Sequence, residues 1–590
     1  MEKTFRSLSW SAALIVLLTV LAYLPAVRGG FVFDDHVLIT RNPMVRAGDG
    51  LYRFWFTTQA TDYYPLTCSL WWLEWRWWDD HAIGYHVVNV LLHAANAVLV
   101  WVILRRLKIP AAWLAAAVFA IHPVNVATVA WISEQKNTLS MLFYALAILL
   151  YLRFDEERRW RWYGLSLAAF VLALLSKTAV VMLPVVLIGC LWWRHGRVRT
   201  QDWLRSVPFF ALSLGAGLLT IRLQYSHAME GRAILPDGFA ARLAAAGWVP
   251  WFYLSKILAP IDLTVVYPKW EIDASRWVSF VPGLVLAVAF LVFWSKRADW
   301  GRAMLFGLGY FVVTLFPVLG FFEQAFYRNS LVADHWQYYS IVGVIALVVA
   351  AGQKIANRMG ERGRTDRVLV SAALLLLLGM ATWKRSGVYA DSETLWRDNV
   401  TKNPYAWMAY NGLGSASQSA GKLDDAIGQY EQALRLKPDY AEAHYNLGTA
   451  LWQTGRLDEA AEQYEQALKL QPKFADAEYN LGVTLLQTRG AQDALGHFEQ
   501  ALRLNPDHAE AHNNLGVALQ QLGRIPEAID QYEQALRLKP DYAEAHNNLA
   551  VALERMGRVP EAIAHFEQVV RLKPDFAEAQ NELARLRQAR

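Results

Sequence analysis

The sequence predicts an all-α protein in two parts, a polytopic membrane domain followed by a solenoid of helical repeats. First, 55% of its 590 residues are hydrophobic, 26 are Trp and only 18% are charged, as is typical of membrane proteins. Second, long apolar runs recur between residues 8 and 383. Third, prolines recur every 34 residues in the last third of the chain, a spacing typical of helical repeats.

Charge is divided unevenly along the chain. Residues 1–400 carry a net charge of +12 and residues 401–590 one of −7, which together give the total of +5. We therefore expect two physically different parts joined near residue 400. The expected boundaries are 1–384 for the membrane domain, 385–406 for a connector, 407–576 for five repeats and 577–590 for a capping helix.

Twelve apolar runs are candidate membrane spans. The first, residues 8–27, could be a signal peptide, but no small-residue cleavage site is obvious before Arg28, and many spans follow. We therefore interpret it as a helix. The other runs lie at residues 84–104, 111–132, 137–152, 162–176, 179–193, 208–223, 243–260, 277–294, 303–321, 338–352 and 367–383.

Clusters of Arg and Lys predict which runs cross the bilayer, because such clusters face the cytoplasm. Between the clusters at 194–205 and 296–302 lie three runs, whereas a return to the same side requires an even number of crossings. We expect 243–260 not to cross, because it contains Lys256 and is interrupted by Pro250. Eleven spans then remain, with the N-terminus in the cytoplasm and the repeats on the outer side.

The first external loop, residues 28–83, contains the adjacent carboxylates Asp34 and Asp35 in the run Phe31-Val-Phe-Asp-Asp-His36. Among apolar side chains at a membrane surface, a low dielectric raises the pKa of a carboxylate, so that it can act as a general base. The alternative is a solvated acid pair without a catalytic role. Trp residues crowd the rest of the loop, which indicates helices lying in the membrane interface.

Polar residues at the ends of the runs are costly in lipid unless they face a cavity or a partner. Several lie on the same predicted outer side as the aspartates, so we expect an external cavity that holds both acids and cations. Lys136, Lys177 and His335 can bind a phosphate there or form structural ion pairs. The other expected pocket residues are His36, His122, Glu134, Asp334, Tyr338 and Tyr339.

A second group of polar residues follows one face of the run at 84–104. It consists of His86, Asn89, His93 and Asn96. We interpret His86, His93 and Asn96 as donors and acceptors of hydrogen bonds between helices, which is the commonest use of such side chains in a membrane bundle.

The C-terminal part has the pattern of tetratricopeptide (TPR) repeats. Pro438 recurs at 472, 506, 540 and 574, and the tract from Ala441 to Gly448 returns at 475–482, 509–516 and 543–550. Such helix-turn-helix units stack their apolar faces into a solenoid with a concave groove that usually binds a peptide.

One asparagine occurs at the same position of four consecutive repeats, and these residues are Asn446, Asn480, Asn514 and Asn548. An amide both donates and accepts, so a ladder of them can hold the backbone of an extended acceptor chain. This arrangement resembles the asparagine ladder of the O-GlcNAc transferase superhelix. The alternative is that these amides bond neighbouring helices, which we favour.

Several motifs resemble a known family in their order. They are Phe33-Asp-Asp-His36, Tyr64-Pro-Leu-Thr67, Gly84 to His93, Ala120-Ile-His-Pro-Val124, Ser176-Lys177 and Ala333 to Tyr339. Together they are similar to the transmembrane and TPR protein O-mannosyltransferases and their bacterial relatives, of the GT-C glycosyltransferase superfamily. The resemblance implies a GT-C-like membrane domain with a catalytic acid at Asp34 or Asp35. The chain departs from it at two positions. His335 stands where bacterial relatives usually carry Arg, and Thr178 stands where the family often carries Glu.

The resemblance implies transfer of mannose or another hexose from a polyprenyl phosphate to Ser or Thr of extracytoplasmic proteins, with the repeats recruiting the acceptor. The expected partners are the lipid-linked donor, protein or peptide acceptors and membrane lipids, with no nucleic acid. The expected location is the inner membrane of a bacterium, with the repeats in the periplasm or outside the cell. No metal site is predicted, and a divalent-metal requirement is left open. The alternatives are a non-catalytic membrane scaffold and a polymerase or ligase of surface glycans.

Overall fold

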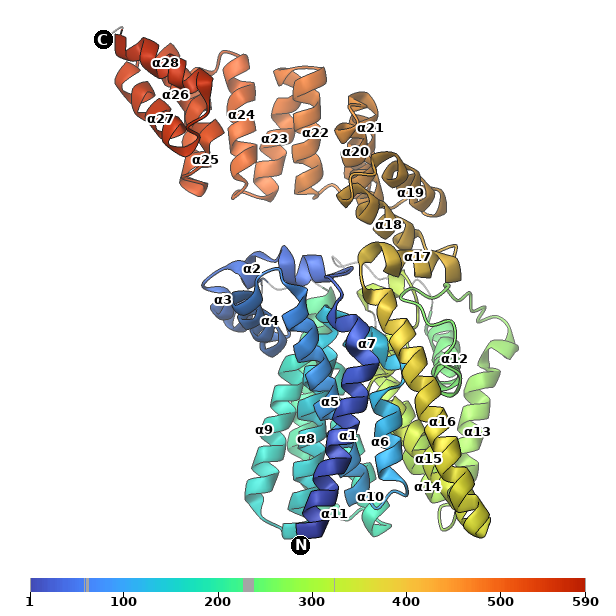
Figure 1. Ribbon diagram of the computed structural model, residues 1–590. Helices are drawn as coiled ribbons and strands as arrows, with labels where there is room; N and C mark the ends of the chain where they lie inside the picture. The colour runs from blue at the N-terminus through green and yellow to red at the C-terminus, as the bar shows by residue number, and fades with distance from the viewer. Residues whose placement is uncertain (1, 58, 60–62, 226–237, 323, 589–590) are drawn as a thin grey trace. The chain divides into compact units, whose positions relative to one another are not determined.

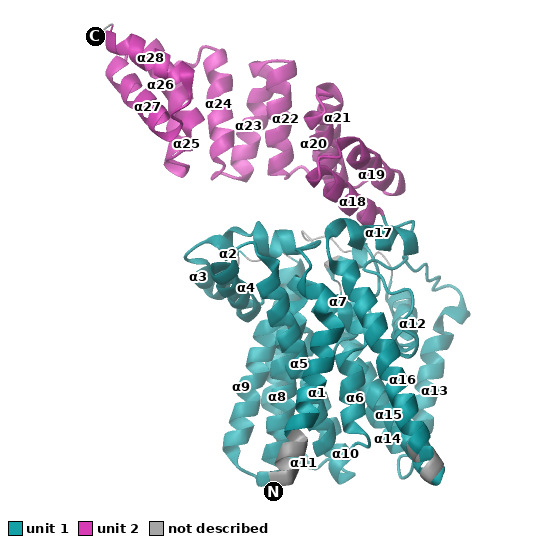
Figure 2. Cartoon of the chain, viewed as in Figure 1, with its two compact units in different colours: residues 1–406 teal, residues 407–590 magenta. Residues whose placement is uncertain are grey.

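The computed structural model describes residues 2–57, 59, 63–225, 238–322 and 324–588. Within these ranges the secondary structure is helical, without a strand, which confirms the predicted all-α class. The chain divides into two compact units, residues 1–406 and residues 407–590 (Figure 2).

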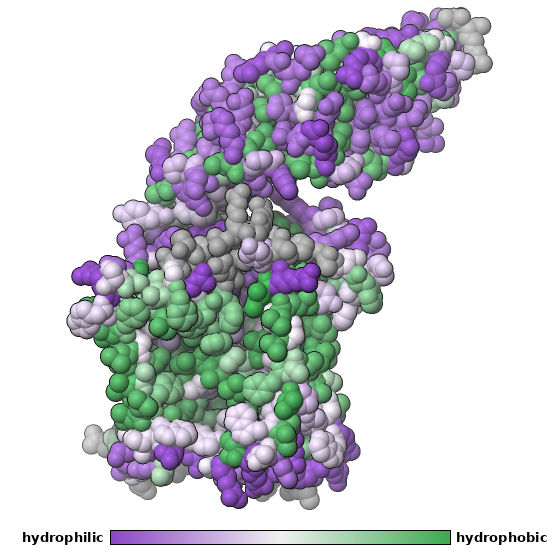
Figure 3. Space-filling model, turned by 180° about the vertical axis from the view of Figure 1, so that it is seen from behind, coloured by the Kyte–Doolittle hydropathy of each residue, from purple (hydrophilic) through white to green (hydrophobic). Residues whose placement is uncertain are grey.

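The first unit is a bundle of long helices that lie side by side (Figure 1). A broad hydrophobic surface covers the middle of this bundle, between hydrophilic ends (Figure 3), as expected for helices in contact with lipid. The helices are α1 (Glu2–Val27), α5 (Ala82–Arg106), α6 (Ala112–Ala120), α7 (Val126–Val129), α8 (Gln135–Glu157), α9 (Trp160–Ser176), α10 (Leu183–His195), α11 (Thr200–Leu223), α12 (Phe239–Leu258), α13 (Val281–Ser295), α14 (Gly301–Leu315), α15 (Ile341–Arg358) and α16 (Gly360–Ser386).

Among the described residues, nine helices are long and apolar enough to cross a membrane. Helices α6 and α7 form a pair bent by 45° and would make a tenth span, whereas α9 is shorter. The predicted eleven spans therefore require both the bent pair and α9 to cross, and that number stays a prediction. Helix α12, which contains Pro250, is not one of the nine, and the expectation that 243–260 does not cross stays a prediction.

The polar face of α5 is used for packing. The Asn89 amide donates to the carbonyls of Thr128 and Val129 at 3.1 and 2.9 Å. The Asn96 amide donates to the Thr138 carbonyl at 2.8 Å. These bonds hold α5 against α7 and α8, because an unpaired amide inside the bundle would be costly.

The loop between the first two spans folds into short helices above the bundle. They are a π-helix (His36–Thr40), α2 (Pro43–Arg46), α3 (Gly50–Phe56) and α4 (Pro65–Trp78). The indole nitrogen of Trp72 donates to the Ala47 carbonyl at 3.0 Å, which ties α4 to the α2–α3 segment. The Thr67 hydroxyl donates to the Ser176 carbonyl at 2.9 Å, which fixes α4 beside the end of α9.

The predicted connector is folded as part of the first unit. After α16 the chain forms a short 3-10 turn and then α17 (Ser392–Lys402). The Arg385 guanidinium donates to Asp398 at 2.6 Å, and the Asn399 side-chain oxygen accepts from the Val266 backbone N–H at 2.8 Å. Helix α17 is therefore held by side-chain contacts that apolar periodicity does not reveal.

The second unit consists of five helix pairs and a last helix, which confirms the predicted TPR solenoid. Its helices are α18 (Trp407–Ser419), α19 (Leu423–Leu436), α20 (Ala441–Gln453), α21 (Leu457–Leu470), α22 (Ala475–Thr488), α23 (Ala491–Leu504), α24 (Ala509–Gln521), α25 (Ile525–Leu538), α26 (Ala543–Arg555), α27 (Val559–Leu572) and α28 (Ala577–Gln588). Each pair packs closely. At Gly448 an added Cβ would lie 2.8 Å from the buried ring of Tyr464, which explains the glycine.

Candidate functional site

The two predicted carboxylates lie in a strained turn directly after α1. Phe33 has a φ of 52°, a conformation that is uncommon for a residue other than glycine and costs free energy. The turn leads through Asp34 and Asp35 into the π-helix at His36–Thr40. Backbone strain of this kind concentrates at functional sites, where it fixes the direction of a side chain.

Ser133 holds both carboxylates. Its hydroxyl donates to Asp34 Oδ1 at 2.6 Å, and its backbone N–H donates to Asp35 Oδ1 at 2.7 Å. Asp35 Oδ2 accepts the backbone N–H of Val32 at 2.9 Å, and the residue is fully buried. Asp35 is therefore held by two backbone groups, whereas Asp34 is partly exposed. Of the two, Asp34 is better placed to meet a substrate.

Burial changes the acidity of both groups. Removal from water raises the pKa of Asp34, an effect that the nearby Lys136 ammonium and the Ser133 hydroxyl oppose. Burial and the neighbouring Asp34 charge raise the pKa of Asp35 to about 8. Such a pair shares its protons, and the member close to a cation loses its proton first.

Two lysines flank one carboxylate next to this pair. Glu134 follows Ser133 and lies 2.9 Å from Lys136 Nζ and 3.4 Å from Lys177 Nζ. The side chain of Glu134 is 2% exposed, whereas those of Lys136 and Lys177 are 14% and 13% exposed. Two ammonium groups thus lie beside one carboxylate, at the place where the sequence predicts phosphate binding or ion pairing.

His335 and Tyr339 complete the cluster from the other side. His335 Nε2 lies 3.9 Å from Glu134 Oε1. Burial lowers the pKa of His335 to about 4, so the ring is neutral at pH 7 and cannot act as a third cation there. The Tyr339 hydroxyl donates to the Asn137 carbonyl at 3.3 Å, and the Asn137 amide donates to Glu134.

Aromatic rings connect the acid pair to this cluster. The ring of Trp131 lies 5.3 Å from that of Phe33 and 5.5 Å from that of His335. On its other side, Phe33 makes an edge contact with Trp396 of α17 at 4.9 Å. The structure therefore gathers Asp34, Asp35, Glu134, Lys136, Lys177, His335 and Tyr339 at one end of the bundle.

An apolar cavity of about 460 Å³ leads away from the cluster. Lys177, Asn137 and Tyr339 line its polar end. The remainder follows α11 from Phe210 to Ile221, a length of roughly 16 Å at the helical rise. The cavity can thus hold an elongated apolar group with a polar head beside Lys177.

Four residues expected in the pocket have other contacts. His122 Nε2 lies 3.0 Å from the Ile257 carbonyl, and His36 Nδ1 lies 3.3 Å from the Thr40 hydroxyl. Tyr338 is turned into the bundle, where its hydroxyl lies 2.7 Å from His93 Nδ1 and accepts from the Asn96 amide at 3.2 Å. Asp334 accepts from the Tyr267 hydroxyl at 2.7 Å. These residues support the surrounding elements rather than the cluster, because each already has a partner on a neighbouring segment.

Three residues of the site were not predicted from the sequence, namely Ser133, Trp131 and Trp396. Ser133 had one signal, its position directly before Glu134, but a single serine at the start of an apolar run has no characteristic spacing. The two tryptophans contact Phe33 and His335 only after folding.

The repeat asparagines bond neighbouring repeats. The Asn446 amide donates to Asn411 Oδ1 at 3.0 Å, and the Asn548 amide donates to Asn513 Oδ1 at 2.9 Å. The amides of Asn480 and Asn514 donate in the same way to tyrosine hydroxyls of the preceding repeat. These contacts support the interpretation favoured from the sequence. All four side chains remain partly exposed, and contact with an acceptor peptide stays a prediction.

Comparisons with known proteins find matches in both units of the chain. Residues 71–221 match the family described as dolichyl-phosphate-mannose-protein mannosyltransferase, and five segments between residues 412 and 588 match the tetratricopeptide repeat. The crystal structure of YrrB, described as a TPR protein with an unusual peptide-binding site, matches 32% of this chain and 96% of its own with 24% identity and a TM-score of 0.30.

Two relatives match most of this chain. One is the protein O-mannosyl-transferase F38B6.6 of Caenorhabditis elegans, 24% identical over 73% of this chain and 63% of the relative. The other is the protein O-mannosyl-transferase TMTC1 of Homo sapiens, 24% identical over 74% of this chain and 56% of the relative. The chain thus spans about three fifths of the length of these relatives. It combines a segment that matches the mannosyltransferase family model with TPR repeats, and the resemblance to the TPR-containing O-mannosyltransferases is confirmed.

Proposed function

We propose that the protein transfers a hexose, in the first instance mannose, from a polyprenyl phosphate to Ser or Thr hydroxyls of extracytoplasmic proteins. The observation that carries the proposal is the position of Asp34 beside the Glu134 cluster, at the polar end of an apolar cavity. The match to dolichyl-phosphate-mannose-protein mannosyltransferases supports a mannosyl donor on a lipid phosphate.

Each part of the reaction has a candidate group. Asp34 takes the proton of the acceptor hydroxyl, whose oxygen attacks the anomeric carbon of the sugar. The bond from that carbon to the phosphate oxygen breaks, and Lys136 and Lys177 stabilise the charge of the departing polyprenyl phosphate. The lipid tail lies in the cavity along α11. Asp35 holds the turn through its two backbone bonds.

The direct test uses the purified full-length protein with polyprenyl-phosphate mannose and a Ser/Thr-containing peptide. We expect a hexose-sized increase in the mass of the peptide, which should disappear when its Ser and Thr are replaced by Ala. If no peptide or protein acceptor is modified but a glycan is extended, the protein is a glycan polymerase or ligase instead. If neither is modified, the scaffold alternative is favoured.

Replacing Lys136 with Met is expected to shift the acidic limb of the pH profile of kcat/KM to higher pH. The Lys136 ammonium lowers the pKa of Asp34, so its removal raises that pKa and the base is lost at a higher pH. Lys177→Met is the matched control, because Lys177 pairs with the same Glu134 but is not among the groups that set the pKa of Asp34. It should weaken donor binding without moving the limb. A shift in both variants, or in neither, contradicts this assignment.

We also propose that the repeats lie outside the cytoplasm, because the basic clusters and the parity of the eleven predicted crossings favour the outer side for both the repeats and Asp34. A reporter that is active only in the cytoplasm should be silent when fused after Arg590 and active when inserted after Lys296. The reverse pattern would contradict the orientation and, with it, the extracytoplasmic acceptor.

A further inference from the structure

A second cavity, of about 480 Å³, lies in the other half of the bundle and is not used by the proposed reaction. Different parts of helix α14 line the two cavities. Its residues Ala303 to Tyr310 line this cavity, whereas Thr314 lines the 460 Å³ cavity along α11, called the donor cavity below. The inner end lies at Tyr310, whose hydroxyl donates to the Tyr339 carbonyl at 3.1 Å.

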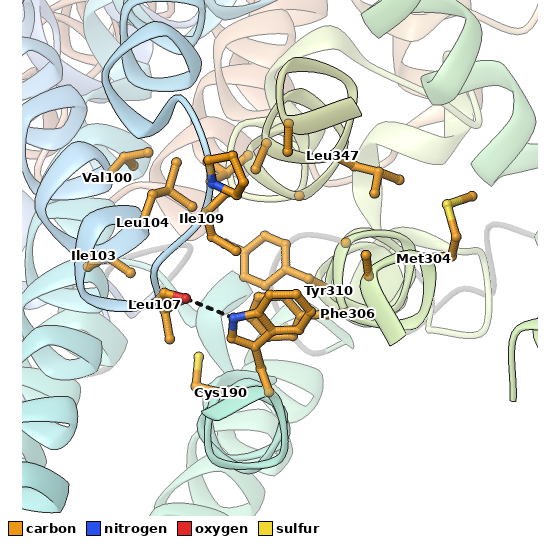
Figure 4. A pocket seen from close by; sticks show the side chains of 18 of the residues that line it. Val100, Ile103, Leu104, Leu107, Ile109, Cys190, Met304, Phe306, Tyr310 and Leu347 are labelled. Atoms are coloured by element: carbon orange, nitrogen blue, oxygen red, sulfur yellow. Dashed lines mark hydrogen bonds between the residues drawn. The ribbon is translucent and has the colours of Figure 1, made fainter. Parts of the chain in front are cut away.

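The walls of this cavity are almost entirely apolar. Figure 4 shows Leu104 of α5, Phe306 of α14 and Leu347 of α15 around the same space. The cavity follows α15 from Val342 to Asn357, a length of roughly 22 Å at the helical rise. This is longer than the roughly 15 Å of hydrocarbon in one leaflet, so the cavity has room for one extended acyl chain and the start of its headgroup.

The end of the cavity beside the basic loops is polar and positively charged. Lys354 lines it together with Asn357 near the end of α15. Trp300 and Trp193 lie at the same end, and Trp193 Nε1 donates to the Leu107 carbonyl at 2.9 Å, the dashed line in Figure 4. Tryptophan and lysine at the mouth of an apolar cavity are typical of the level of lipid headgroups.

We propose that this cavity binds one acyl chain of an anionic phospholipid from the leaflet beside the basic loops, with its phosphate at Lys354. The apolar walls exclude a polar ligand, and the length along α15 fits a chain that enters from one leaflet. Because Lys354 is exposed, it can meet the headgroup without being drawn into the hydrocarbon. The site is independent of sugar transfer, so its test does not depend on the proposed function.

The experiment is native mass spectrometry of the full-length protein in detergent, with phosphatidylglycerol and phosphatidylcholine of identical acyl chains as probes. The wild type is expected to retain one phosphatidylglycerol more tightly than phosphatidylcholine. Ala350→Trp fills the cavity and should abolish this adduct. Val348→Trp is the matched control, because Val348 lies on the same helix, is 50% exposed and does not line the cavity. It should leave the adduct unchanged.

A second pair of variants tests the headgroup. Lys354→Glu should weaken phosphatidylglycerol binding about fivefold, which is the effect of losing one cation near a membrane surface. The affinity for phosphatidylcholine should stay unchanged. Lys296→Glu removes a basic residue that does not line the cavity and should have no effect. Ala303→Trp on the opposite wall replaces Ala350→Trp if the latter does not fold.

Three results would overturn the proposal. The first is a folded Ala350→Trp or Ala303→Trp protein that retains phosphatidylglycerol as the wild type does. The second is equal retention of both phospholipids with no effect of Lys354→Glu. The third is displacement of phosphatidylglycerol from the wild type by polyprenyl phosphate, together with loss of polyprenyl phosphate binding in Ala350→Trp, which would assign the cavity to the donor tail.

Discussion

Replacing Asp34 with Asn should lower kcat/KM for sugar transfer by about 10²- to 10⁴-fold, the usual contribution of a general base. The amide is nearly the same size as the carboxylate and can still accept the Ser133 hydroxyl, but it cannot take a proton. The measurement is the initial rate of transfer to a short peptide, together with the thermal unfolding midpoint in detergent. Activity close to that of the wild type would exclude Asp34 as the base.

Asp35→Asn is the control for this result. Asp35 accepts two backbone N–H groups, and an amide can satisfy only one of them with its single oxygen. The loss leaves one buried donor unpaired, at a cost of roughly 1–3 kcal/mol in the free energy of unfolding. We therefore expect Asp35→Asn to lower stability and activity together, whereas Asp34→Asn lowers activity alone. The opposite pattern would exchange the two roles.

Truncation at two nearby positions should give very different enzymes. A chain that ends at Ala406 is expected to modify a short, concentrated peptide at nearly the wild-type rate, whereas one that ends at Ser386 should be inactive. The shorter chain lacks α17, whose Trp396 is 2% exposed and packs on Phe33 beside Asp34. It also lacks Ala390, whose carbonyl accepts the Gly30 backbone N–H at 2.8 Å.

Protein acceptors distinguish the role of the repeats from that of α17. If the repeats bind acceptors, the chain that ends at Ala406 loses the high effective concentration that tethering provides, so transfer to proteins should fall sharply. Equal modification of protein acceptors with and without the repeats would show that the repeats serve another partner. Activity in the chain that ends at Ser386 would show that α17 does not position the aspartate turn.

The fold could be predicted where apolar residues or repeats recur at regular spacing in the sequence. Apolar runs of span length and a repeat of 34 residues each determine a helix and the face that it buries, so both units were foreseen. Helix α17 was not, because Arg385, Asp398 and Asn399 hold it through pairings that have no periodic signature. The bend between α6 and α7 lies at His122 and Pro123, within a run that was interpreted as a single span.

The grouping of some residues of the candidate site could also be predicted from the sequence. Charged groups in lipid need partners, so Asp34, Glu134 and the lysines could be assigned to one cavity before folding was known. Tyr338 and Tyr339 show the limit of that argument. They are neighbours in sequence, but one faces His93 inside the bundle and the other faces Asn137 of the cluster. The packing of the 3-10 turn before α15 determines which of the two tyrosines faces the cluster.

Helix α14 forms part of the wall of both cavities, and this has a thermodynamic consequence. The inner end of the phospholipid cavity is Tyr310, and Tyr339, to which Tyr310 donates, lines the donor cavity. If a phospholipid changes the affinity for the donor by some factor, the donor must change the affinity for the phospholipid by the same factor. The effect of phospholipid on donor affinity and the effect of donor on phospholipid affinity would then both measure a single coupling free energy.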